Sequence, residues 1–154
     1  MHIIPYAMMQ YLDNKEKACF IYDSLFSYFI IRHDFSPELP VSKQYVLCEP
    51  DYVWMRIEFP VTIMPQLCPD VFALLNELNT GSEPGTFSIN TENGEIDYHE
   101  KVYLKGSAGE LAAYVYEREE EIILQYTSCF FDLLRKKGLY TFYLDAYQYF
   151  RQKI

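Results

Sequence analysis

Hydrophobic and polar residues alternate along the stretch from residue 51 to residue 59. One side of an extended strand there would be apolar and the other mostly polar or amphipathic: Val53, Met55, Ile57 and Phe59 against Tyr52, Trp54, Arg56 and Glu58. Because side chains of a strand point alternately to opposite faces, the pattern predicts one face in the core and one partly in water. Another strand is predicted over residues 44–48, before the turn residues Glu49-Pro50-Asp51.

The segment from residue 18 to residue 35 is rich in aromatic and β-branched side chains. This composition predicts strands over residues 18–23 and 26–34, with a turn at Asp23-Ser24. A continuous helix is the alternative, because periodicity alone does not distinguish short apolar runs. Before these strands, apolar residues near helical spacing predict a short helix over residues 5–17.

An amphipathic helix is predicted over residues 66–79, where apolar residues recur at three- and four-residue steps. Pro69 suits its first turn, since the N–H that proline lacks has no partner inside the helix there. Gly81 is able to end the helix in a left-handed conformation. Earlier in the chain, two prolines within residues 36–40 predict a loop.

A β-hairpin around Asn93-Gly94 is the strongest local prediction. Phe87 and Ile89 alternate with polar residues on its first strand. Ile96 and Tyr98 would lie approximately opposite them on the second strand. Because asparagine and glycine both accept a positive φ, the sequence predicts a two-residue turn of type I′.

A long helix is predicted to begin at Ser107 and to run towards Lys137. Ser107 and Glu110 have the spacing of a capping box, and Gly138 offers a stop. A second, short helix is predicted over residues 139–154. This aromatic C-terminal extension is expected to pack on the domain or on a partner subunit. The buried stripe expected on the long helix is Leu111, Val115, Ile122, Ile123, Tyr126, Phe130, Leu133 and Leu134.

These elements predict an α+β fold, a single domain over residues 1–154. Its order is roughly α-β-β-β-(β)-α-β-β-α followed by a C-terminal helix, with an antiparallel sheet covered by helices on one face. At 154 residues the chain is long enough to bury a core without disulfides or metals.

Composition and charge narrow the possible partners. Half of the residues are hydrophobic and 18% are aromatic, which excludes a disordered chain. The net charge of −9 disfavours binding to nucleic acid and to anionic membranes, because phosphate groups would be repelled. No signal peptide or membrane-spanning run is recognised, so a cytoplasmic protein is expected.

Candidate chemistry is sparse. His33-Asp34 and His99-Glu100 each join a base to a carboxylate, but adjacent residues of a strand point to opposite faces. Ordinary surface or strand histidines are therefore expected. No catalytic motif, phosphate-binding loop or metal-ligand spacing is present, so no catalytic residue, no metal site and no cofactor is predicted.

Two other polar features receive structural interpretations. The acidic run over residues 117–121 is more typical of a solvated helix face than of a cation site, because consecutive carboxylates spread around a helix. The scattered cysteines, which include no C-x-x-C pair, are expected to be reduced core residues: Cys19, Cys48, Cys68 and Cys129.

The candidate interaction surface is aromatic. It combines the partly wet face of the strand over residues 51–59 with the aromatic C-terminal extension, although packing of the extension on the core is the alternative for that part. Its residues are Tyr52, Trp54, Tyr143, Tyr147 and Phe150.

The segment from residue 74 to residue 104 contains three short motifs in a recognisable order. They are Leu75-Asn76-Glu77-Leu78-Asn79, Gly85-Thr86-Phe87 and Asn93-Gly94-Glu95. In these motifs the chain resembles the YbjN family of bacterial sensory transduction regulators, which is similar in fold to type III secretion chaperones. The resemblance covers roughly residues 52–138, and the Pro-rich residues 36–40 and the extension after Gly138 depart from that family's pattern. It implies a sandwich of helices on an antiparallel sheet, often dimeric, with no catalytic residues.

The leading functional hypothesis is therefore a non-enzymatic, protein-binding or regulatory domain, expected to form a homodimer and to bind another protein or peptide. One alternative is a small acidic immunity or antitoxin-type inhibitor, whose charge would complement a basic toxin. A second alternative, from a different class, is an enzyme with an unrecognised carboxylate site.

Overall fold

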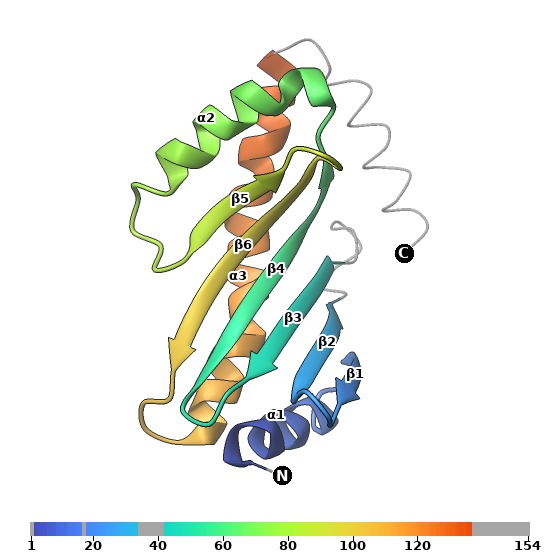
Figure 1. Cartoon of the computed structure of the whole chain (residues 1–154), viewed down its shortest axis with the longest axis vertical. Helices are drawn as coiled ribbons and strands as arrows, with labels where there is room; N and C mark the ends of the chain where they lie inside the picture. Colours follow the sequence, from blue (N-terminus) through green and yellow to red (C-terminus); the bar gives the residue numbers. More distant parts are fainter. Residues whose placement is uncertain (1, 17, 34–41, 137–154) are drawn as a thin grey trace.

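A six-stranded antiparallel sheet runs through the molecule, with its strands in the order β1-β2-β3-β4-β6-β5 (Figure 1). The structure is a computed structural model and describes residues 2–16, 18–33 and 42–136. A short 3-10 helix, η1 (Pro65–Leu67), leads into the second α-helix. The other elements in chain order are α1 (Ile3–Asp13), β1 (Cys19–Asp23), β2 (Tyr28–His33), β3 (Ser42–Cys48), β4 (Tyr52–Thr62), α2 (Cys68–Leu78), β5 (Thr86–Asn90), β6 (Glu95–Tyr103) and α3 (Ala108–Lys136).

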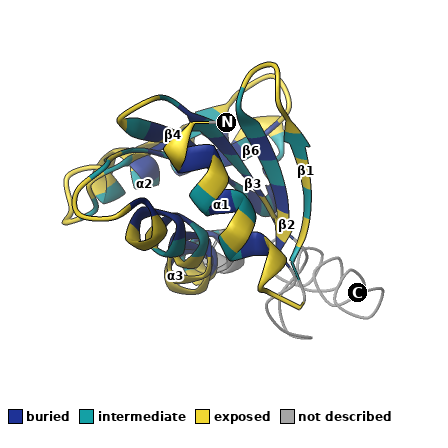
Figure 2. Ribbon diagram, turned by 90° about the horizontal axis from the view of Figure 1, so that it is seen from below, coloured by how far each residue is buried: buried dark blue, intermediate teal, exposed yellow. Residues whose placement is uncertain are grey.

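The helices α1 and α3 lie on one face of the sheet, and α2 packs on the edge strand β5 (Figures 1 and 2). We call the side that α1 and α3 occupy the covered face and the opposite side the open face. The predicted α+β fold and its element order are confirmed as far as α3. The predicted loop over residues 36–40, the stop at Gly138 and the helix over residues 139–154 lie outside the described residues.

The strand β4 confirms the predicted alternation. Val53, Met55 and Ile57 are at most 1% exposed on the covered face, whereas their neighbours in sequence point to the open face. The strand extends beyond the predicted end, and its pairing with β6 shifts between Glu58 and Thr62. Pro60 lies within that irregularity, where a residue without an N–H interrupts few ladder bonds.

The segment after α1 forms strands, so the helical alternative for it is wrong. The turn between β1 and β2 is built around Asp23, whose carboxylate accepts hydrogen bonds from the backbone N–H groups of Leu25 and Phe26 at 2.9 and 3.4 Å. Ser27 completes the turn with a φ of 52°. The turn predicted at Asp23 is correct because a short polar side chain there can accept hydrogen bonds from the backbone of its own turn.

The hairpin of β5 and β6 has the predicted pairing but not the predicted turn. Ile89 faces Ile96 and Phe87 faces Tyr98, as expected. The loop contains four residues rather than two, because Asn90 pairs with Glu95. Only Gly94 has a positive φ there, 73°, and its N–H bonds Asn90 O at 2.7 Å, so the type I′ prediction is wrong. A Cβ at Gly94 would lie 2.1 Å from the Ile63 carbonyl oxygen.

The helix α2 begins at Cys68, two residues after the predicted start, and Pro69 lies in its first turn as predicted. Gly81 does not take a left-handed conformation. Asn79 instead connects the helix end to the sheet. Its side-chain amide donates to Phe87 O at 2.9 Å and accepts from Phe87 N at 2.6 Å. One asparagine therefore satisfies both backbone groups of an edge-strand residue, a role that a capping glycine could not fill.

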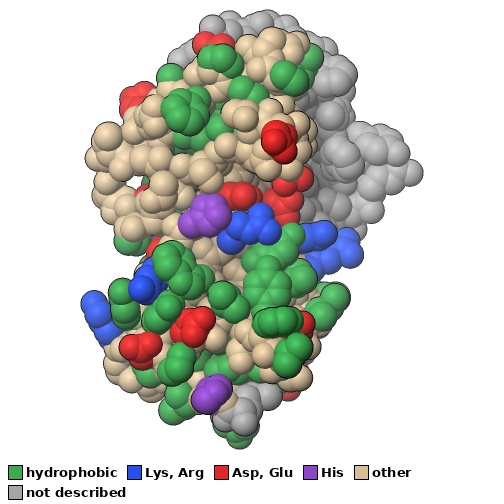
Figure 3. All heavy atoms as spheres, viewed as in Figure 1, with side chains coloured by type: hydrophobic (Ala, Val, Ile, Leu, Met, Phe, Trp, Pro, Cys, Tyr) green, Lys and Arg blue, Asp and Glu red, His purple; other side chains and the backbone are tan. Residues whose placement is uncertain are grey.

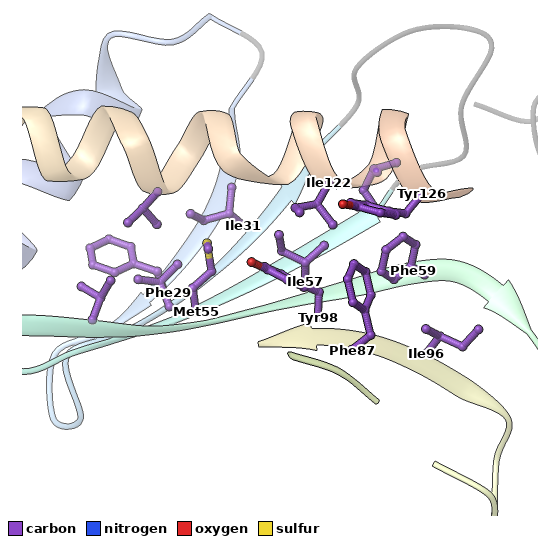
Figure 4. Close-up of a cluster of buried hydrophobic side chains, with 14 of the residues drawn as sticks. Phe29, Ile31, Met55, Ile57, Phe59, Phe87, Ile96, Tyr98, Ile122 and Tyr126 are labelled. Atoms are coloured by element: carbon purple, nitrogen blue, oxygen red, sulfur yellow. The ribbon is translucent and has the colours of Figure 1, made fainter. Parts of the chain in front are cut away.

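The helix α3 lies across the covered face and supplies much of the core (Figure 4). Ser107 Oγ accepts a hydrogen bond from the Glu110 N–H at 3.1 Å, as expected for the N-terminal cap. Ile122 and Tyr126 point towards Ile57 and Phe59 of β4 (Figure 4). Six residues of the predicted stripe are buried, namely Leu111, Val115, Ile122, Ile123, Tyr126 and Phe130. Leu133 is half-buried, and the side chain of Leu134 lies outside the described part of the chain.

Candidate functional site

The open face gathers large side chains that the core does not use. Trp54 is 45% exposed and Tyr103 is 52% exposed, although both lie in the regular part of the sheet. Figure 3, which views this face, shows hydrophobic side chains gathered over its lower half and basic and histidine side chains beside them. Since monomeric proteins seldom expose contiguous apolar surface without a use for it, this face is the candidate functional site.

The strand register arranges the open face in rows across the sheet. Antiparallel pairing places the residues of one row next to one another, so each row collects side chains from distant parts of the sequence. The rows become more polar from one end of the sheet to the other. They are Tyr28, Leu47, Trp54 and Lys101; then Ile30, Tyr45, Arg56 and His99; then Arg32, Lys43, Glu58 and Asp97.

Three aromatic rings surround one ammonium group at the apolar end of this face. We call Tyr52, Trp54 and Tyr103 the aromatic trio. The ring centroid of Tyr52 lies 5.7 Å from that of Tyr103 and 6.3 Å from that of Trp54. Lys101 Nζ lies 4.2 Å from the centroid of Tyr52, 4.8 Å from that of Tyr103 and 5.3 Å from that of Trp54. These distances are those of cation–π contacts, which draw the lysine onto the rings.

Residues of the first two rows surround a shallow hollow of about 140 Å³, which is lined by Tyr28, Tyr45, Leu47, Trp54, Met55, Arg56 and His99. The Arg56 guanidinium lies 3.9 Å from the ring centroid of Tyr45 and 3.3 Å from Asp97 Oδ2. The Tyr45 hydroxyl donates to Glu58 at 3.0 Å. Burial, followed by this hydrogen bond and the charge of Glu58, raises the pKa of Tyr45. Burial also lowers the pKa of His99, which favours the neutral imidazole.

The covered face contains a charged cluster around Arg118, which is 8% exposed. Arg118 donates to Glu100 at 3.0 Å, to Glu121 at 3.0 Å, to the Tyr98 hydroxyl at 3.1 Å, and also to Glu83. Burial opposes ionisation of Glu83, but hydrogen bonds from Tyr126 and Arg118 outweigh it and lower the pKa of Glu83. We call this group the Arg118 cluster.

Glu100 receives further donors within the Arg118 cluster. The hydroxyls of Tyr98 and Tyr114 each lie 2.6 Å from one of its carboxylate oxygens. Burial, and then the hydrogen bond to Glu100, raises the pKa of each phenol. Tyr126 is likewise held by Glu83 at 2.6 Å, and burial together with this bond raises the pKa of Tyr126 to about 12. The phenols therefore act as donors, and both oxygens of Glu83 and of Glu100 accept at least one hydrogen bond.

A second polar cluster surrounds Glu119, the next residue of α3. Ser42 Oγ donates to one carboxylate oxygen at 2.6 Å, and His33 Nε2 lies 2.6 Å from the other. His33 Nε2 is also 3.0 Å from Gln44 Oε1, an acceptor, so this ring nitrogen carries the proton. Burial raises the pKa of Glu119, although the hydrogen bonds from His33 and Ser42 act against it. We call this group the Glu119 cluster.

The structure corrects three interpretations of the sequence, two of them at the Glu119 cluster. The acidic run is not simply a solvated face, because Glu119 is fully buried. His33 is not an ordinary strand histidine, since it lies 2% exposed against Glu119, which is 86 residues away in sequence. The prediction that all cysteines belong to the core fails at Cys19, which is exposed. Cys48 and Cys68 are buried as expected, and Cys129 is half-buried.

The structure brings together only part of the predicted interaction surface. Tyr52 and Trp54 contact one another on the open face, whereas Tyr143, Tyr147 and Phe150 lie outside the described residues. Sequence reasoning missed Tyr103 and Lys101, which join the patch through the pairing of β4 with β6. The available signal was the alternation of β6, which places both on the polar side of that strand, but the sequence does not give the register.

Two possible types of site receive no support in the described part of the chain. No group of three or more histidine, cysteine, aspartate or glutamate residues there is placed to hold a metal ion. None of the described helices combines the length and apolar character that crossing a membrane requires.

Comparison with protein-family models, curated proteins and solved structures finds no match for this chain. The resemblance to the YbjN family therefore stays a prediction.

Proposed function

We propose that this chain is a non-enzymatic domain that binds a polypeptide partner on the open face of its sheet. The single observation that carries the proposal is the exposed aromatic trio beside the hollow at Tyr45 and Arg56. Tryptophan, tyrosine and arginine are the residues that most often dominate binding energy at protein interfaces. Here all three types lie on one face, held by regular strands instead of mobile loops.

The arrangement of the carboxylates supports binding over catalysis. Glu100 and Glu119 are buried and Glu83 is half-buried, and all three are hydrogen-bonded to groups of the chain itself. A general acid or base needs to reach a substrate proton, and these oxygens are engaged in holding α3 onto the sheet. The hollow on the open face is also shallow, whereas small-molecule sites usually enclose several hundred Å³.

The expected homodimer would be one form of this binding. Two copies can associate through the same face without a change in structure, and the open face combines cations with the carboxylates of Glu58 and Asp97. Light scattering of the wild type and of Trp54→Ala separates this case from binding to a different protein. A Trp54-dependent dimer identifies the second copy as the partner.

The direct test is quantitative capture with a matched control. Full-length wild type, Trp54→Ala and Phe72→Ala would each be used to recover proteins from a lysate of cells that express the chain. Phe72 is an exposed aromatic residue, 56% exposed, and it belongs to α2 instead of the sheet. We expect Trp54→Ala to reduce recovery of the partner at least about tenfold, as truncation of a central aromatic residue usually does, and Phe72→Ala to leave it unchanged.

The proposal fails if recovery and self-association are both indifferent to Trp54→Ala, or if both variants lose the partner equally. Equal melting temperatures of the three proteins would confirm that the exposed substitutions do not act by unfolding the chain.

A further inference from the structure

We infer that the aromatic trio is a binding site for a lysine or arginine side chain of the partner, and that Lys101 occupies this site in the free protein. The inference deepens the proposed function, on which it rests, by naming the chemistry of the partner as a basic polypeptide segment. It depends on the geometry of four side chains on two neighbouring strands.

The trio presents several ring faces to one point. Tyr52 pairs with Tyr103 across the strands, and Trp54 pairs with Lys101 in the adjacent position. The ring of Trp54 is nearly perpendicular to that of Tyr52, at 85°, and the ring of Tyr103 is tilted by 49°. Rings inclined to one another around a shared centre can offer their negative faces to a single cation. Lys101 demonstrates this preference, since its ammonium lies within 5.3 Å of all three centroids.

Lys101 is suited to be an internal competitor instead of a permanent part of the site. It is only half-buried, and its long, flexible side chain starts from β6 beside the rings. The side chain can turn towards solvent when another cation arrives, because an ammonium group is well hydrated. The hydrogen bond with Tyr103, ahead of the opposing effect of burial, raises the pKa of Lys101, so it remains a cation at neutral pH.

The charge of the molecule favours a basic partner. The chain carries a net charge of −9, which attracts cations at long range and accelerates their association. Close to the trio, the charge of Asp51 acts on Lys101 and would act in the same way on a cation that replaced it. Long-range attraction and local aromatic contact therefore select the same class of side chain.

Trp54 allows a direct test, because it is the only tryptophan of the chain. Its emission would be followed while the full-length protein is titrated with a synthetic peptide of alternating arginine and glycine. Peptides in which glutamate or serine replaces arginine serve as comparisons at the same ionic strength. We expect a saturable change in emission with the arginine peptide only.

The decisive variants are Lys101→Met and Lys43→Met. Both remove one positive charge from the open face. Lys43, however, lies on β3, opposite Glu58 and at a distance of two rows from the aromatic trio. A general effect of charge would therefore be the same in the two variants. Loss of a competing cation–π contact at an exposed site corresponds to about two- to fivefold tighter binding, so we expect this gain for Lys101→Met beyond any change seen in Lys43→Met.

A second pair of variants tests the rings. Tyr103→Leu keeps apolar surface but removes one ring face, and it should weaken binding of the arginine peptide. Tyr6→Leu removes an equally exposed tyrosine of α1, 53% exposed, and should leave binding unchanged. The retained emission of Trp54 in both variants shows that the site is still folded.

The inference is overturned if the glutamate peptide changes Trp54 emission as strongly as the arginine peptide, or if Lys101→Met weakens binding or matches Lys43→Met. A response to the glutamate peptide, or weaker binding by Lys101→Met, would assign Lys101 to the recognition of acidic or neutral partners, and equal effects of the two lysine variants would mean that only the overall charge matters. None of these outcomes bears on the dependence of capture on Trp54. They would leave the proposed function intact as long as capture still depends on Trp54, so the two proposals can fail separately.

Discussion

The Arg118 cluster and the Glu119 cluster are centred on consecutive residues of α3, but their charged groups are stabilised in different ways. Arg118 is a permanent cation, and it neutralises part of the charge of Glu83 and Glu100 while Tyr98, Tyr114 and Tyr126 donate to the same carboxylates. Glu119 has His33 and Ser42 as hydrogen-bond partners, and neither is a permanent cation. A buried carboxylate without a fixed counter-charge keeps its proton more readily, which agrees with the opposite directions of the pKa shifts at Glu83 and Glu119.

Neighbouring positions on one helix can therefore give opposite dependence of stability on pH. The clusters also have different structural roles. The Arg118 cluster joins α3 to β6 and to the loop before β5, whereas the Glu119 cluster joins α3 to β2 and β3. Together they attach one helix to both halves of the sheet.

The largest expected effect is that of Arg118→Met. This change leaves the buried Glu100 and the half-buried Glu83 without their cation, which typically costs about 3–5 kcal/mol of the free energy of unfolding. Urea denaturation followed by circular dichroism would measure the loss. Glu121→Gln is the matched control, because the Glu121 side chain is 61% exposed, and it should change stability by no more than about 0.5 kcal/mol. A loss below about 1 kcal/mol for Arg118→Met would refute a central role for this cation.

Gly85→Ala should be the next most destabilising change. The Gly85 N–H bonds the Tyr98 hydroxyl at 3.0 Å, and a Cβ would lie 2.2 Å from His99 O and 2.5 Å from the Tyr98 ring. Overpacking of this kind costs about 1–3 kcal/mol, measured by thermal denaturation. In Gly109→Ala the nearest atom to the new Cβ is 3.8 Å away, and alanine favours the helix, so this control should be neutral or stabilising. Equal stability of both variants would contradict close packing at Gly85.

Ser42→Ala tests the Glu119 cluster. It removes the buried hydroxyl that donates to Glu119 at 2.6 Å, and we expect a loss of about 1–3 kcal/mol in the free energy of unfolding, towards the lower end if the carboxylate takes up its proton. Ser128→Ala, at an exposed position of α3, is the control, and it should change the free energy of unfolding by no more than about 0.5 kcal/mol. A neutral Ser42→Ala would mean that the hydroxyl contributes nothing to holding Glu119.

The smallest expected effect is a difference between Glu119 and Glu83 in the pH dependence of their contributions to stability. Since the pKa of Glu119 is raised on folding, its contribution to stability is fully present below its unfolded pKa and is lost as the pH rises through the folded value. The pKa of Glu83 is lowered, so its contribution is present above the unfolded pKa and is lost as the pH falls through the folded value.

The stability of Glu119→Gln relative to wild type should therefore increase as the pH rises from acidic to neutral. The stability of Glu83→Gln relative to wild type should decrease over the same range. Melting temperatures between pH 4 and pH 7 would show the two trends, with Glu120→Gln, at an exposed position, as the control. Parallel trends for Glu119→Gln and Glu83→Gln would remove the contrast between the clusters.

Local patterns predicted the elements of this fold, whereas tertiary pairing determined the polar contacts. The alternation in β4 and the sequence around Asp23 depend on neighbouring residues, and both predictions are confirmed. His33 meets Glu119 only because the fold brings the last residue of β2 to α3, which no local pattern discloses. Lys101 joins the aromatic trio because of one particular register between β4 and β6.

The errors at turns have a similar cause. Asn93-Gly94 satisfies the composition of a type I′ turn, but the bond from the Gly94 N–H to Asn90 O and the contact of Gly94 O with Ile63 N, at 2.8 Å, favour a four-residue loop. Gly81 satisfies the composition of a helix stop, but Asn79 is held by the backbone of Phe87. In both places a contact with a neighbouring element outweighs the local preference.

The side chain of Asn79 has a consequence for assembly. It occupies the donor and the acceptor of Phe87 that a strand arriving at β5 would need, and α2 packs beside it. Head-to-tail stacking of many copies requires an accessible strand at both ends of the sheet, and at this end both backbone groups of Phe87 are already bonded within the chain. An amide that ends one helix thus also hinders the addition of a further strand beside β5.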